Sequence, residues 1–498
     1  MTSKRPRTTR IAATAAVLGL TVLGAQSATG AIQDEPTSTP VPITTPDGQV
    51  SSYIINTKVA NPGQVRKAGK AIVAADGVVV QSWPQIGVIV AHSTEGDFRT
   101  AVAASAKNSI ESVGPTRTVA VSEGTPAGAQ APWGPGAGQL RKNLTKKSAD
   151  ISTGTAAAST DPREGEQWDM EMINVPQAHQ ITTGSPDVTV GVLDSGIDPD
   201  HPDLANQIDR SKSVGCTDAG RPASGESAWA PTTSDHGTHV AGTIGAERNG
   251  VGIVGIAPGA KMASVKVVND DGFIYPEYAV CGFMEAGLKG MDVTNNSYYV
   301  DPFEFWCGDQ PEQAPALESV RRAVEWSTKQ GTAHVAAAGN SSYDLSDKTT
   351  NDSSPNDAAV PTDRVINSSC KDIPTELDGV VTVSSIDKQE KLSYFSNRGL
   401  GSIDVAAPGS SILSTVVKDN GWGTKSGTSM ASPHVTGVIA LMKSAHPTWG
   451  PQKLVSEVRA QATDTPCSTT LAGAPCVGTD QENSFYGDGI VDAYAAVR

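Results

Sequence analysis

The sequence predicts an α/β protein with a doubly wound, mostly parallel sheet and helices on both faces, preceded by a small α+β domain of the ferredoxin-like type. Two observations support this fold class. Short apolar segments alternate with helical patterns over residues 166–498, as expected when parallel strands are joined by crossover helices. Residues 51–121 instead follow the order β-α-β-β-α-β, which is typical of a split βαβ unit.

Length and composition agree with more than one globular domain. The chain has 498 residues, of which 38% are hydrophobic and 18% charged, so it is longer than one typical domain and can bury a sizeable core. Its net charge is -15. An acidic chain lacks the basic surface that binding to nucleic acid requires, so we expect no nucleic-acid partner.

Residues 1–31 are predicted to be a signal peptide. Basic residues at positions 4, 5, 7 and 10 precede an apolar run at 11–23, and small residues follow it, which is the three-part pattern of a cleaved export signal. The run is shorter than the ~20 residues that span a bilayer. We therefore expect a secreted, extracellular protein that is not held in a membrane after the signal is removed.

The next elements follow in order along the chain. Residues 32–50 are rich in Pro, Thr and Ser and are predicted to be a linker. In the α+β domain we expect strands at 53–59, 78–83, 86–92 and 116–121 and helices at 62–75 and 95–106. Residues 122–165 lose periodicity and are predicted to be an exposed linker open to proteolysis.

The C-terminal domain, residues 166–498, carries the strongest alternation of strand and helix patterns. Functional sites in such sheets form at the carboxyl ends of the strands. We expect strands at 188–193, 262–268, 293–297, 333–338 and 380–385, and helices at 275–289, 316–329 and 430–445.

Cysteine usage predicts three disulfides. No pair has the C-x-x-C spacing of a zinc ribbon or a thioredoxin site, and an even number of cysteines in an exported chain favours disulfides over free thiols. Fifteen pairings remain open, with the short loop between the last two cysteines as the favoured single pair. The cysteines are Cys216, Cys281, Cys307, Cys370, Cys467 and Cys476.

The first polar segment of note ends the strand predicted at 188–193. Asp194 follows an apolar run, at the carboxyl end of a strand. A carboxylate buried there needs a hydrogen-bond donor, and an imidazole N–H would serve. Taken alone, an Asp at such a junction is an ordinary turn residue.

The second segment contains two histidines among small residues at the start of an apolar helix. His236 and His239 are three residues apart. The zinc motif with an intervening Glu spaces its histidines by four. Metal binding by this pair is therefore the weaker alternative, and a single functional histidine is favoured.

The third segment places a serine at the start of a long apolar helix. Ser429 follows Gly and Thr, so its hydroxyl lies where the helix dipole favours negative charge. A helix cap is the ordinary role of such a serine. The three segments together favour a serine nucleophile, because such a serine needs a general base and the base needs a carboxylate partner.

These segments, in the order Asp, His, Ser, resemble the signature segments of the subtilisin-like serine peptidases over about residues 166–498. The resemblance implies that Asp194 orients His236, that His236 acts as general base, and that Ser429 attacks the scissile carbonyl. It also implies that Asn340 and the backbone N–H of Ser429 bind the oxyanion, and that His239 is structural. Proteins or peptides would then be the substrates of a serine endopeptidase.

The resemblance also implies where substrate binds. Residues 292–297 resemble the edge strand that pairs with substrate backbone, which assigns substrate contacts to Ser297, Tyr298, Tyr299 and Gly339. The family usually has Leu-Gly where this chain has the two tyrosines. The preferred residue before the cut therefore stays open.

The α+β domain resembles the family's propeptide, which assists folding and inhibits the enzyme. The resemblance implies an autoprocessed precursor cut between Val121 and Glu166. The chain's own propeptide would be its first partner, and we expect a monomeric mature enzyme.

No cofactor is needed for this chemistry, but relatives often hold structural calcium. Asp203 matches one ligand position, and Asn249 lies in the loop that would form the rest of the site. Arg248 stands where a neutral amide is usual, and its charge would repel Ca²⁺.

Two apparent insertions relative to the family carry cysteines. Residues 214–233 contain Cys216 and residues 300–313 contain Cys307. On this basis we expect the pairs Cys216–Cys281 and Cys307–Cys370.

Other function classes are disfavoured by specific motifs. A non-catalytic binding protein on the same fold would be expected to have lost Asp194, His236, Asn340 or Ser429. An esterase with a nucleophile elbow needs Gly-x-Ser-x-Gly, and a dinucleotide-binding enzyme needs Gly-x-Gly-x-x-Gly after its first strand; neither motif surrounds Ser429 or Asp194.

Overall fold

The computed structural model describes residues 35–123, 160–467 and 474–498. Residues 37–498 form one compact unit. The predicted signal peptide and most of the predicted linker at 122–165 lie outside the described residues, so these two predictions are not addressed by the structure. Within the described part of the chain, no helix is long and apolar enough to cross a membrane.

The N-terminal domain has the predicted β-α-β-β-α-β order. Its four strands form one antiparallel sheet in the order β2-β3-β1-β4, and Asn61 caps the first helix through its side chain. The elements are β1 (Ser51–Thr57), α1 (Pro62–Ala74), β2 (Gly77–Trp83), β3 (Val88–Ser93), α2 (Phe98–Ser105) and β4 (Ile110–Pro115).

The fourth strand was predicted at 116–121, and this placement is wrong. The strand that pairs with β1 is β4, at Ile110–Pro115. The sequence signal for β4 is weak, because it contains Ser, Gly and Pro, which are poor strand formers. The residues that follow bond elsewhere: the Arg117 side chain enters a buried ionic cluster, and the Thr118 hydroxyl donates to Asp357 at 2.6 Å.

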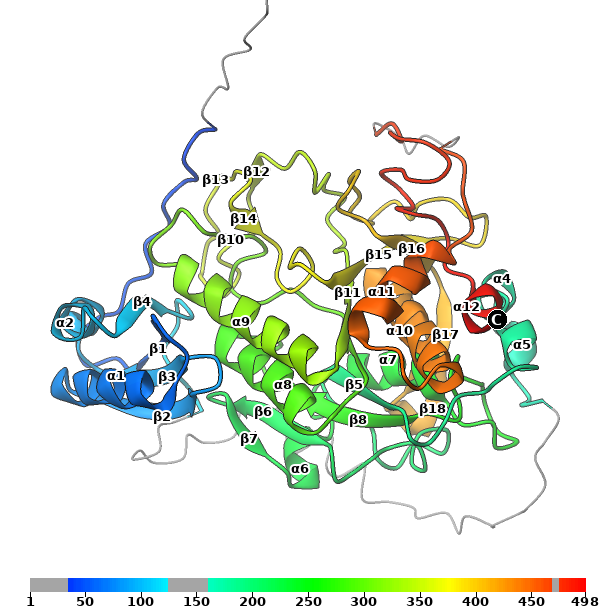
Figure 1. The fold of residues 1–498 in the computed structure, drawn as a ribbon, viewed down its shortest axis with the longest axis horizontal. Helices are drawn as coiled ribbons and strands as arrows, with labels where there is room; N and C mark the ends of the chain where they lie inside the picture. Colours follow the sequence, from blue (N-terminus) through cyan, green and yellow to red (C-terminus); the bar gives the residue numbers. More distant parts are fainter. Residues whose placement is uncertain (1–34, 124–159, 468–473) are drawn as a thin grey trace, which may run out of the picture. The chain divides into compact units, whose positions relative to one another are not determined.

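The C-terminal domain is built on an eight-stranded sheet in the order β16-β15-β11-β9-β5-β8-β6-β7 (Figure 1). All neighbouring strands are parallel except β6 and β7, which confirms the predicted doubly wound, mostly parallel sheet. The strands are β5 (Thr189–Asp194), β6 (Val214–Asp218), β7 (Arg221–Ala223), β8 (Lys261–Lys266), β9 (Val293–Asn296), β11 (Ala333–Ala337), β15 (Val380–Ile386) and β16 (Val405–Pro408).

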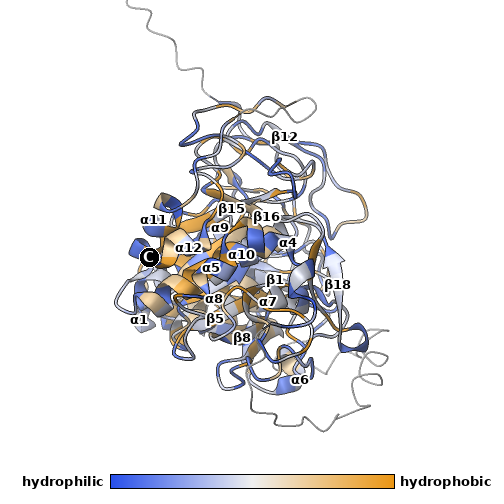
Figure 2. Cartoon of the chain, turned by 90° about the vertical axis from the view of Figure 1, so that its right-hand side faces the viewer, coloured by the Kyte–Doolittle hydropathy of each residue, from blue (hydrophilic) through white to orange (hydrophobic). Residues whose placement is uncertain are grey.

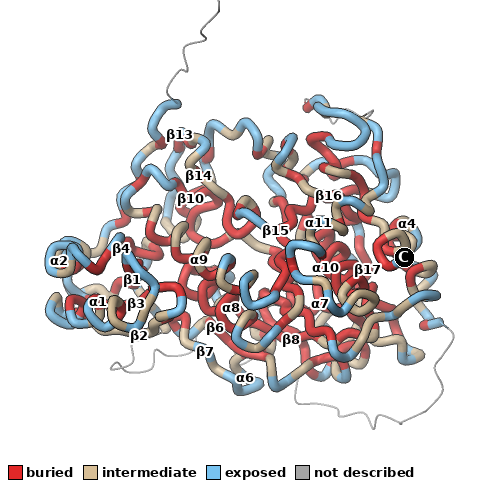
Figure 3. The backbone as a smooth tube through the Cα atoms, viewed as in Figure 1, coloured by how far each residue is buried: buried red, intermediate tan, exposed pale blue. Residues whose placement is uncertain are grey.

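Helices cover both faces of this sheet. On one face α7 (His236–Gly245) and α10 (Thr428–Ala445) pack together, and on the other face α8 (Pro276–Leu288) packs against α9 (Ala314–Gln330). Strand side chains alternate between the two layers: Val192 joins the core under α7 and α10, and Leu193 joins the core under α8 and α9. The apolar central strands and α10 are accordingly buried (Figures 2 and 3).

Shorter elements complete the domain. A hairpin packs against α7, and two small two-stranded sheets lie among the long loops. These elements are β17 (Ile412–Val416) with β18 (Gly421–Lys425), β10 (Trp306–Cys307) with β14 (Cys370–Lys371), β12 (Thr350–Asn351) with β13 (Arg364–Val365), η1 (Glu164–Glu166), η2 (Lys418–Asn420), α4 (Trp168–Met172), α5 (Val175–Ala178), α6 (Glu226–Trp229), α11 (Pro451–Ala460) and α12 (Ala493–Val497).

All six cysteines are paired as the sequence led us to expect. The disulfides are Cys216–Cys281, Cys307–Cys370 and Cys467–Cys476. The first joins β6 to α8, and the second joins β10 to β14. Both tie segments that are more than 60 residues apart in sequence, where cross-linking limits the unfolded chain most.

Residues 37–50, in the segment predicted to be a linker, are mostly exposed or half-buried, but a few of their side chains are buried against the rest of the protein. Val41 and Ile43 are buried in the same core as α8 and α9. The backbone N–H of Thr39 donates to Val365 O at 2.9 Å, and the Ser38 hydroxyl donates to Asp309 at 2.6 Å. A segment rich in Pro and Thr can lie flat along a surface because its extended backbone is already favoured.

Candidate active site

Asp194 is the last residue of β5 and is fully buried. Its Oδ1 accepts a hydrogen bond from the backbone N–H of Ser195 at 2.7 Å. It faces His236, the first residue of α7, whose Nδ1 lies 2.8 Å from Oδ1 and 2.9 Å from Oδ2. The structure therefore brings together two residues from the first two predicted segments.

Gly237 lets this helix start so close to the strand. A Cβ at position 237 would lie 2.6 Å from the carbonyl oxygen of Gly196 and 3.0 Å from Cβ of Asp194. Any larger residue would push α7 away from β5 and separate His236 from Asp194. The glycine after the histidine is thus required by the close approach of two backbones.

The electrostatic surroundings of His236 favour its protonated form. Burial disfavours the charged imidazole, but the charge of Asp194 and its hydrogen bond outweigh burial and raise the pKa of His236 above its ordinary value. The imidazole is about a third exposed, so one side of the ring is open to a reactant. Asp235 beside it is held by Lys425, with Nζ 2.8 Å from Oδ1.

His239 has a different environment, as expected. It is fully buried, and its Nε2 lies 3.1 Å from Ile412 O and 3.2 Å from Gly423 O. Burial lowers the pKa of His239 to about 4, so the ring is neutral and donates one N–H to these carbonyls of the β17–β18 hairpin. This contact ties α7 to the hairpin and does not form a metal site with His236.

Ser429 lies in the first turn of α10, the helix that packs against α7. It is half-buried, and its Oγ donates to the carbonyl oxygen of Ser297 at 3.3 Å. In return, the Ser297 hydroxyl donates to Ser429 O at 2.9 Å. A bond of 3.3 Å is long and weak. Among the hydrogen bonds of the described residues, none joins the Ser429 hydroxyl to His236, and such catalytic bonds often form only when substrate binds.

Asn340 lies just after β11 and is exposed at the surface. Its Oδ1 accepts from both the backbone N–H and the hydroxyl of Thr428, at 2.8 and 2.9 Å. The carbonyl end of the amide is therefore held, and the NH₂ end is the one left to donate. Thr428 also accepts from Gly339 N at 3.1 Å, a positioning role that sequence reasoning missed because Thr428 was noted only as part of the serine motif.

The residues assigned to substrate binding lie on two neighbouring strands of the sheet. Ser297 follows β9 and Gly339 follows β11, and these two strands are paired. Tyr298 is half-buried with its hydroxyl donating to Asn296 at 3.2 Å, and the Tyr299 hydroxyl accepts from Asn356 at 3.0 Å. Parallel strands end at one edge of the sheet, so these positions share the edge with Asp194.

Most oxygens of the residues predicted to bind calcium have protein partners in this structure. Asp203 Oδ2 accepts from the Trp422 indole N–H at 2.7 Å and from Ile253 N at 3.2 Å. The Asn249 amide oxygen accepts from Val251 N at 3.0 Å. Ca²⁺ requires six to eight oxygen ligands. Asp203 Oδ2 and the Asn249 amide oxygen already face N–H donors, whereas Asp203 Oδ1 is buried without a hydrogen-bond partner.

The loop predicted to hold calcium is bound by other protein groups. Asp161 accepts from the backbone N–H of Gly250 at 2.7 Å, and Arg248 pairs with Glu164 at 3.3 Å. Among the described residues, the one group with metal-ligand spacing is Cys307, Asp309 and Cys370. Its two cysteines form a disulfide, so their sulfurs are not thiolate ligands.

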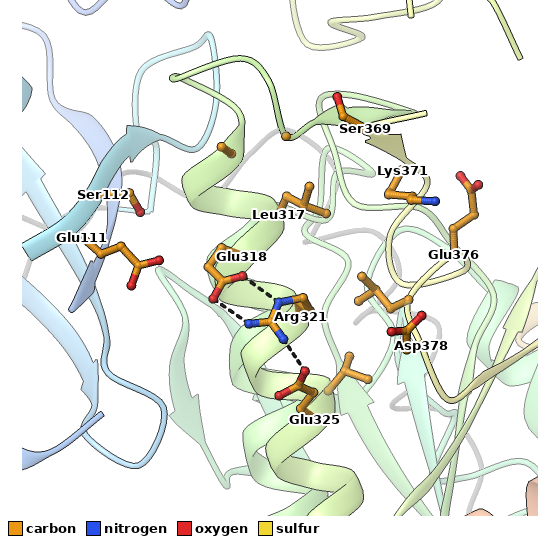
Figure 4. A pocket seen from close by; sticks show the side chains of 14 residues that line it. Glu111, Ser112, Leu317, Glu318, Arg321, Glu325, Ser369, Lys371, Glu376 and Asp378 are labelled. Atoms are coloured by element: carbon orange, nitrogen blue, oxygen red, sulfur yellow. Dashed lines mark hydrogen bonds and ion pairs between the residues drawn. The ribbon is translucent and has the colours of Figure 1, made fainter. Parts of the chain in front are cut away.

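A cavity of about 470 Å³ lies along α9, away from these residues (Figure 4). Its lining comes from α9, from β4 on one side of that helix and from residues 369–378 on the other side, and includes Glu111, Ser112, Leu317, Glu318, Arg321, Ser369, Lys371, Glu376 and Asp378. Neither Asp194, His236 nor Ser429 lines it.

Comparison with known proteins agrees with this fold. The sequence pattern of the Subtilase family matches residues 185–489. Subtilisin BL of Lederbergia lenta is 31% identical over 334 residues, which cover 66% of this chain and 98% of that protein. Subtilisin E of Bacillus subtilis (strain 168) is 32% identical over 333 residues, which cover 66% of this chain and 71% of that protein.

Two solved structures share the fold over most of the chain. An epidermin leader peptide processing serine protease from Staphylococcus aureus aligns with a TM-score of 0.65 and 21% identity, over 90% of this chain and 98% of its own. Fervidolysin from Fervidobacterium pennivorans aligns with a TM-score of 0.62 and 24% identity, over 92% of this chain and 64% of its own.

The doubly wound sheet, with an acid and an imidazole at its carboxyl edge and a serine at the start of a packed helix, defines a serine peptidase of the α/β class. The chain belongs to the subtilase family. It is therefore a serine-type endopeptidase that uses a catalytic triad.

Proposed function

We propose that this chain is a secreted serine endopeptidase, made as a preproprotein, with Asp194, His236 and Ser429 as its triad. The observation that carries the proposal is the 2.8 Å contact between Asp194 and His236, opposite a serine on the helix that packs against α7. A serine with a carboxylate-oriented imidazole nearby is what nucleophilic attack on an amide requires.

The proposed reaction runs through an acyl-enzyme. The Ser429 Oγ forms a bond to the scissile carbonyl carbon as its proton passes to Nε2 of His236. The carbon–nitrogen bond then breaks, and His236 returns the proton to the leaving amine. Water then attacks the ester carbonyl and gives its proton to His236. The bond from the carbonyl carbon to Ser429 Oγ breaks, His236 returns the proton to that oxygen, and the carboxylic acid product leaves. No cofactor takes part.

The oxyanion would be bound by the Asn340 side chain and the backbone N–H of Ser429. The Thr428 contacts hold the Asn340 carbonyl and leave its NH₂ group to donate. The Ser429 N–H lies in the first turn of α10, where helix N–H groups lack intrahelical partners. Donors fixed before the reaction stabilise the developing charge without reorganising.

We further propose that residues 51–121 act as an inhibitory and folding-assisting propeptide, removed by a cut between Val121 and Glu166. The domain packs on α8 and α9, where Asn56 donates to Pro315 O at 2.8 Å and Ser52 donates to Glu277 at 2.9 Å. Its core is joined to that of the catalytic domain through Ile54 and Trp83. The mature enzyme would act on proteins outside the cell as a monomer.

The intact mass of the secreted product tests this proposal. We would compare wild type, Ser429→Ala and, as the control, Ser426→Ala, which removes an exposed hydroxyl from the same segment. Wild type and control should appear as mature enzyme and react with a fluorophosphonate, whereas Ser429→Ala should stay a precursor and remain unlabelled.

Other outcomes separate the parts of the proposal. If Ser429→Ala matures like wild type, another protease makes the cut, and autoprocessing is wrong. If wild type neither matures nor reacts with the fluorophosphonate, the chain is a non-catalytic binding protein on this fold.

A further inference from the structure

Asp372 is a buried carboxylate directly beside the assigned substrate edge. It follows β14 and is 2% exposed, and its Oδ1 has no hydrogen-bond partner. Its Oδ2 lies 3.7 Å from where a Cβ on Gly339 would be, and Gly339 immediately precedes Asn340. A carboxylate buried without a partner is costly, so this position calls for an explanation.

The acids near Asp372 are well partnered, in contrast to Asp372 itself. Glu376 pairs with Lys348 at 2.6 Å. Glu304 accepts from Ser341 at 2.9 Å and from Asn351 at 3.0 Å. Asp372 is the member of this group that keeps a buried oxygen without a donor.

Carboxyl groups outnumber cations around Asp372. Three carboxylates, Glu304, Asp372 and Glu376, face two buried cations, Lys348 and Arg364. Burial, with Glu376 and Glu304 nearby, holds the pKa of Asp372 well above its ordinary value, and Lys348 opposes this shift only in part. A cation brought to Oδ1 would favour the ionised form of this carboxyl and pair with it.

The segment that holds Asp372 is bonded to the segment that holds Tyr299. The backbone N–H of Val300, next to Tyr299, donates to the carbonyl oxygen of Ile373, next to Asp372, at 2.9 Å. Tyr299 lies shortly after the end of β9, and Gly339 lies shortly after the end of the neighbouring β11. A side chain that entered between Gly339 and Tyr299 would therefore point toward Asp372.

We propose that Asp372 is a specificity-determining residue that selects a lysine or arginine side chain immediately before the cut. The assignment rests on the proposed endopeptidase function and names its substrate class. Gly339 keeps the path to the carboxylate open because it has no side chain, and an ammonium or guanidinium group would supply the donor that Oδ1 lacks. An apolar side chain there would leave the carboxylate buried and unpaired.

The segment proposed to contain the self-cleavage site has suitable residues. Between Val121 and Glu166 the sequence carries two pairs of adjacent basic residues, Arg141–Lys142 and Lys146–Lys147. A preference for basic residues at the cut would allow the precursor to recognise its own linker. The mature N-terminus, read from the intact mass, locates this cut.

Peptides that differ only in the residue before the cut test the assignment. The mature enzyme would be given Arg, Lys, Leu, Phe and Glu peptides, and kcat/KM measured for wild type, Asp372→Asn and the control Asp378→Asn, which removes an exposed charge from the same segment. Wild type and control should favour Arg and Lys over Phe and Leu by on the order of 10²-fold, since losing one partner of a desolvated charge pair has this effect. In Asp372→Asn this preference should disappear.

A second measurement keeps the test decisive if Asp372→Asn fails to fold. Benzamidine, which is cationic, should inhibit wild type competitively, whereas its neutral analogue benzamide should not. Equal effects of the two compounds, a wild-type preference for Phe or Leu, or an unchanged Arg-to-Phe ratio in folded Asp372→Asn would each overturn the assignment.

The two proposals fail in distinguishable ways. If Ser429 reacts with a fluorophosphonate and peptides are cleaved without a basic preference, only the role of Asp372 is wrong. If Ser429 does not react and no peptide is cleaved, the endopeptidase proposal falls and the specificity assignment falls with it.

Discussion

Replacing Arg117 with leucine should loosen the N-terminal domain from the catalytic domain. Its side chain is 1% exposed and lies against Glu277 of α8, which is 0% exposed. The guanidinium also pairs with Glu123 at 2.8 Å and stacks 3.8 Å from the centre of the Tyr275 ring. Arg117 is therefore the countercharge of a fully buried carboxylate.

The loss of stability in Arg117→Leu depends on the hydrogen bonds that Glu277 would keep. One of its oxygens would retain Ser52 at 2.9 Å and Thr116 at 3.2 Å, and Oε2 has no partner even in the intact cluster. Removing one partner of a buried ion pair costs about 3–5 kcal/mol, because the other charge is left uncompensated. Adding Glu277→Gln removes that charge and should recover more than half of the loss.

Urea unfolding of the Ser429→Ala precursor, followed by tryptophan fluorescence, measures these changes without self-cleavage. The matched control is Arg99→Ala, because Arg99 pairs with Glu312 at 2.8 Å across the same contact but is about a third exposed. That change should cost at most about 1 kcal/mol. The reasoning is refuted if Arg117→Leu costs no more than Arg99→Ala, or if the double variant is as unstable as the single one.

Three further predictions concern the site and its surroundings. Asp194→Asn should lower kcat by about 10⁴-fold and move the rising limb of the pH–rate profile to lower pH, because Asp194 is what raises the pKa of His236; an unmoved limb would contradict this cause. Asn340→Ala should lower kcat by about 10²–10³-fold with little change in KM, and steady-state kinetics showing the loss in KM instead would remove Asn340 from the oxyanion site. Chelation should leave the thermal midpoint unchanged, whereas Trp422→Phe should cost about 1–3 kcal/mol by taking a donor from the buried Asp203 carboxylate; calorimetry showing a chelator-dependent midpoint would mean that an ion binds there.

Local patterns predicted much of the fold. The alternation of apolar strands and helices predicted the parallel sheet, because strands buried on both faces must be apolar throughout. The N-terminal β-α-β-β-α-β order was also predicted, apart from its fourth strand. That strand was misplaced because Ser112, Gly114 and Pro115 form it through pairing with β1, a long-range contact that overrides their weak local preference.

Some residues of the candidate site could likewise be predicted from the sequence, and others could not. From sequence, the resemblance of local motifs to the subtilisin-like peptidases predicted roles for Asp194, His236, Asn340 and Ser429, since each lies among small residues at the end of a strand or the start of a helix. It could not place Asp372, whose neighbours Gly339, Glu304 and Lys348 come from separate segments and whose surroundings follow no motif. It could not reveal that Trp422 faces Asp203, or that Arg117 meets Glu277, because burial and pairing of charges arise only when distant segments pack together. Tertiary structure therefore decided which buried charges have a partner. These pairings determine the expected substrate specificity and how firmly the N-terminal domain is attached to the catalytic domain.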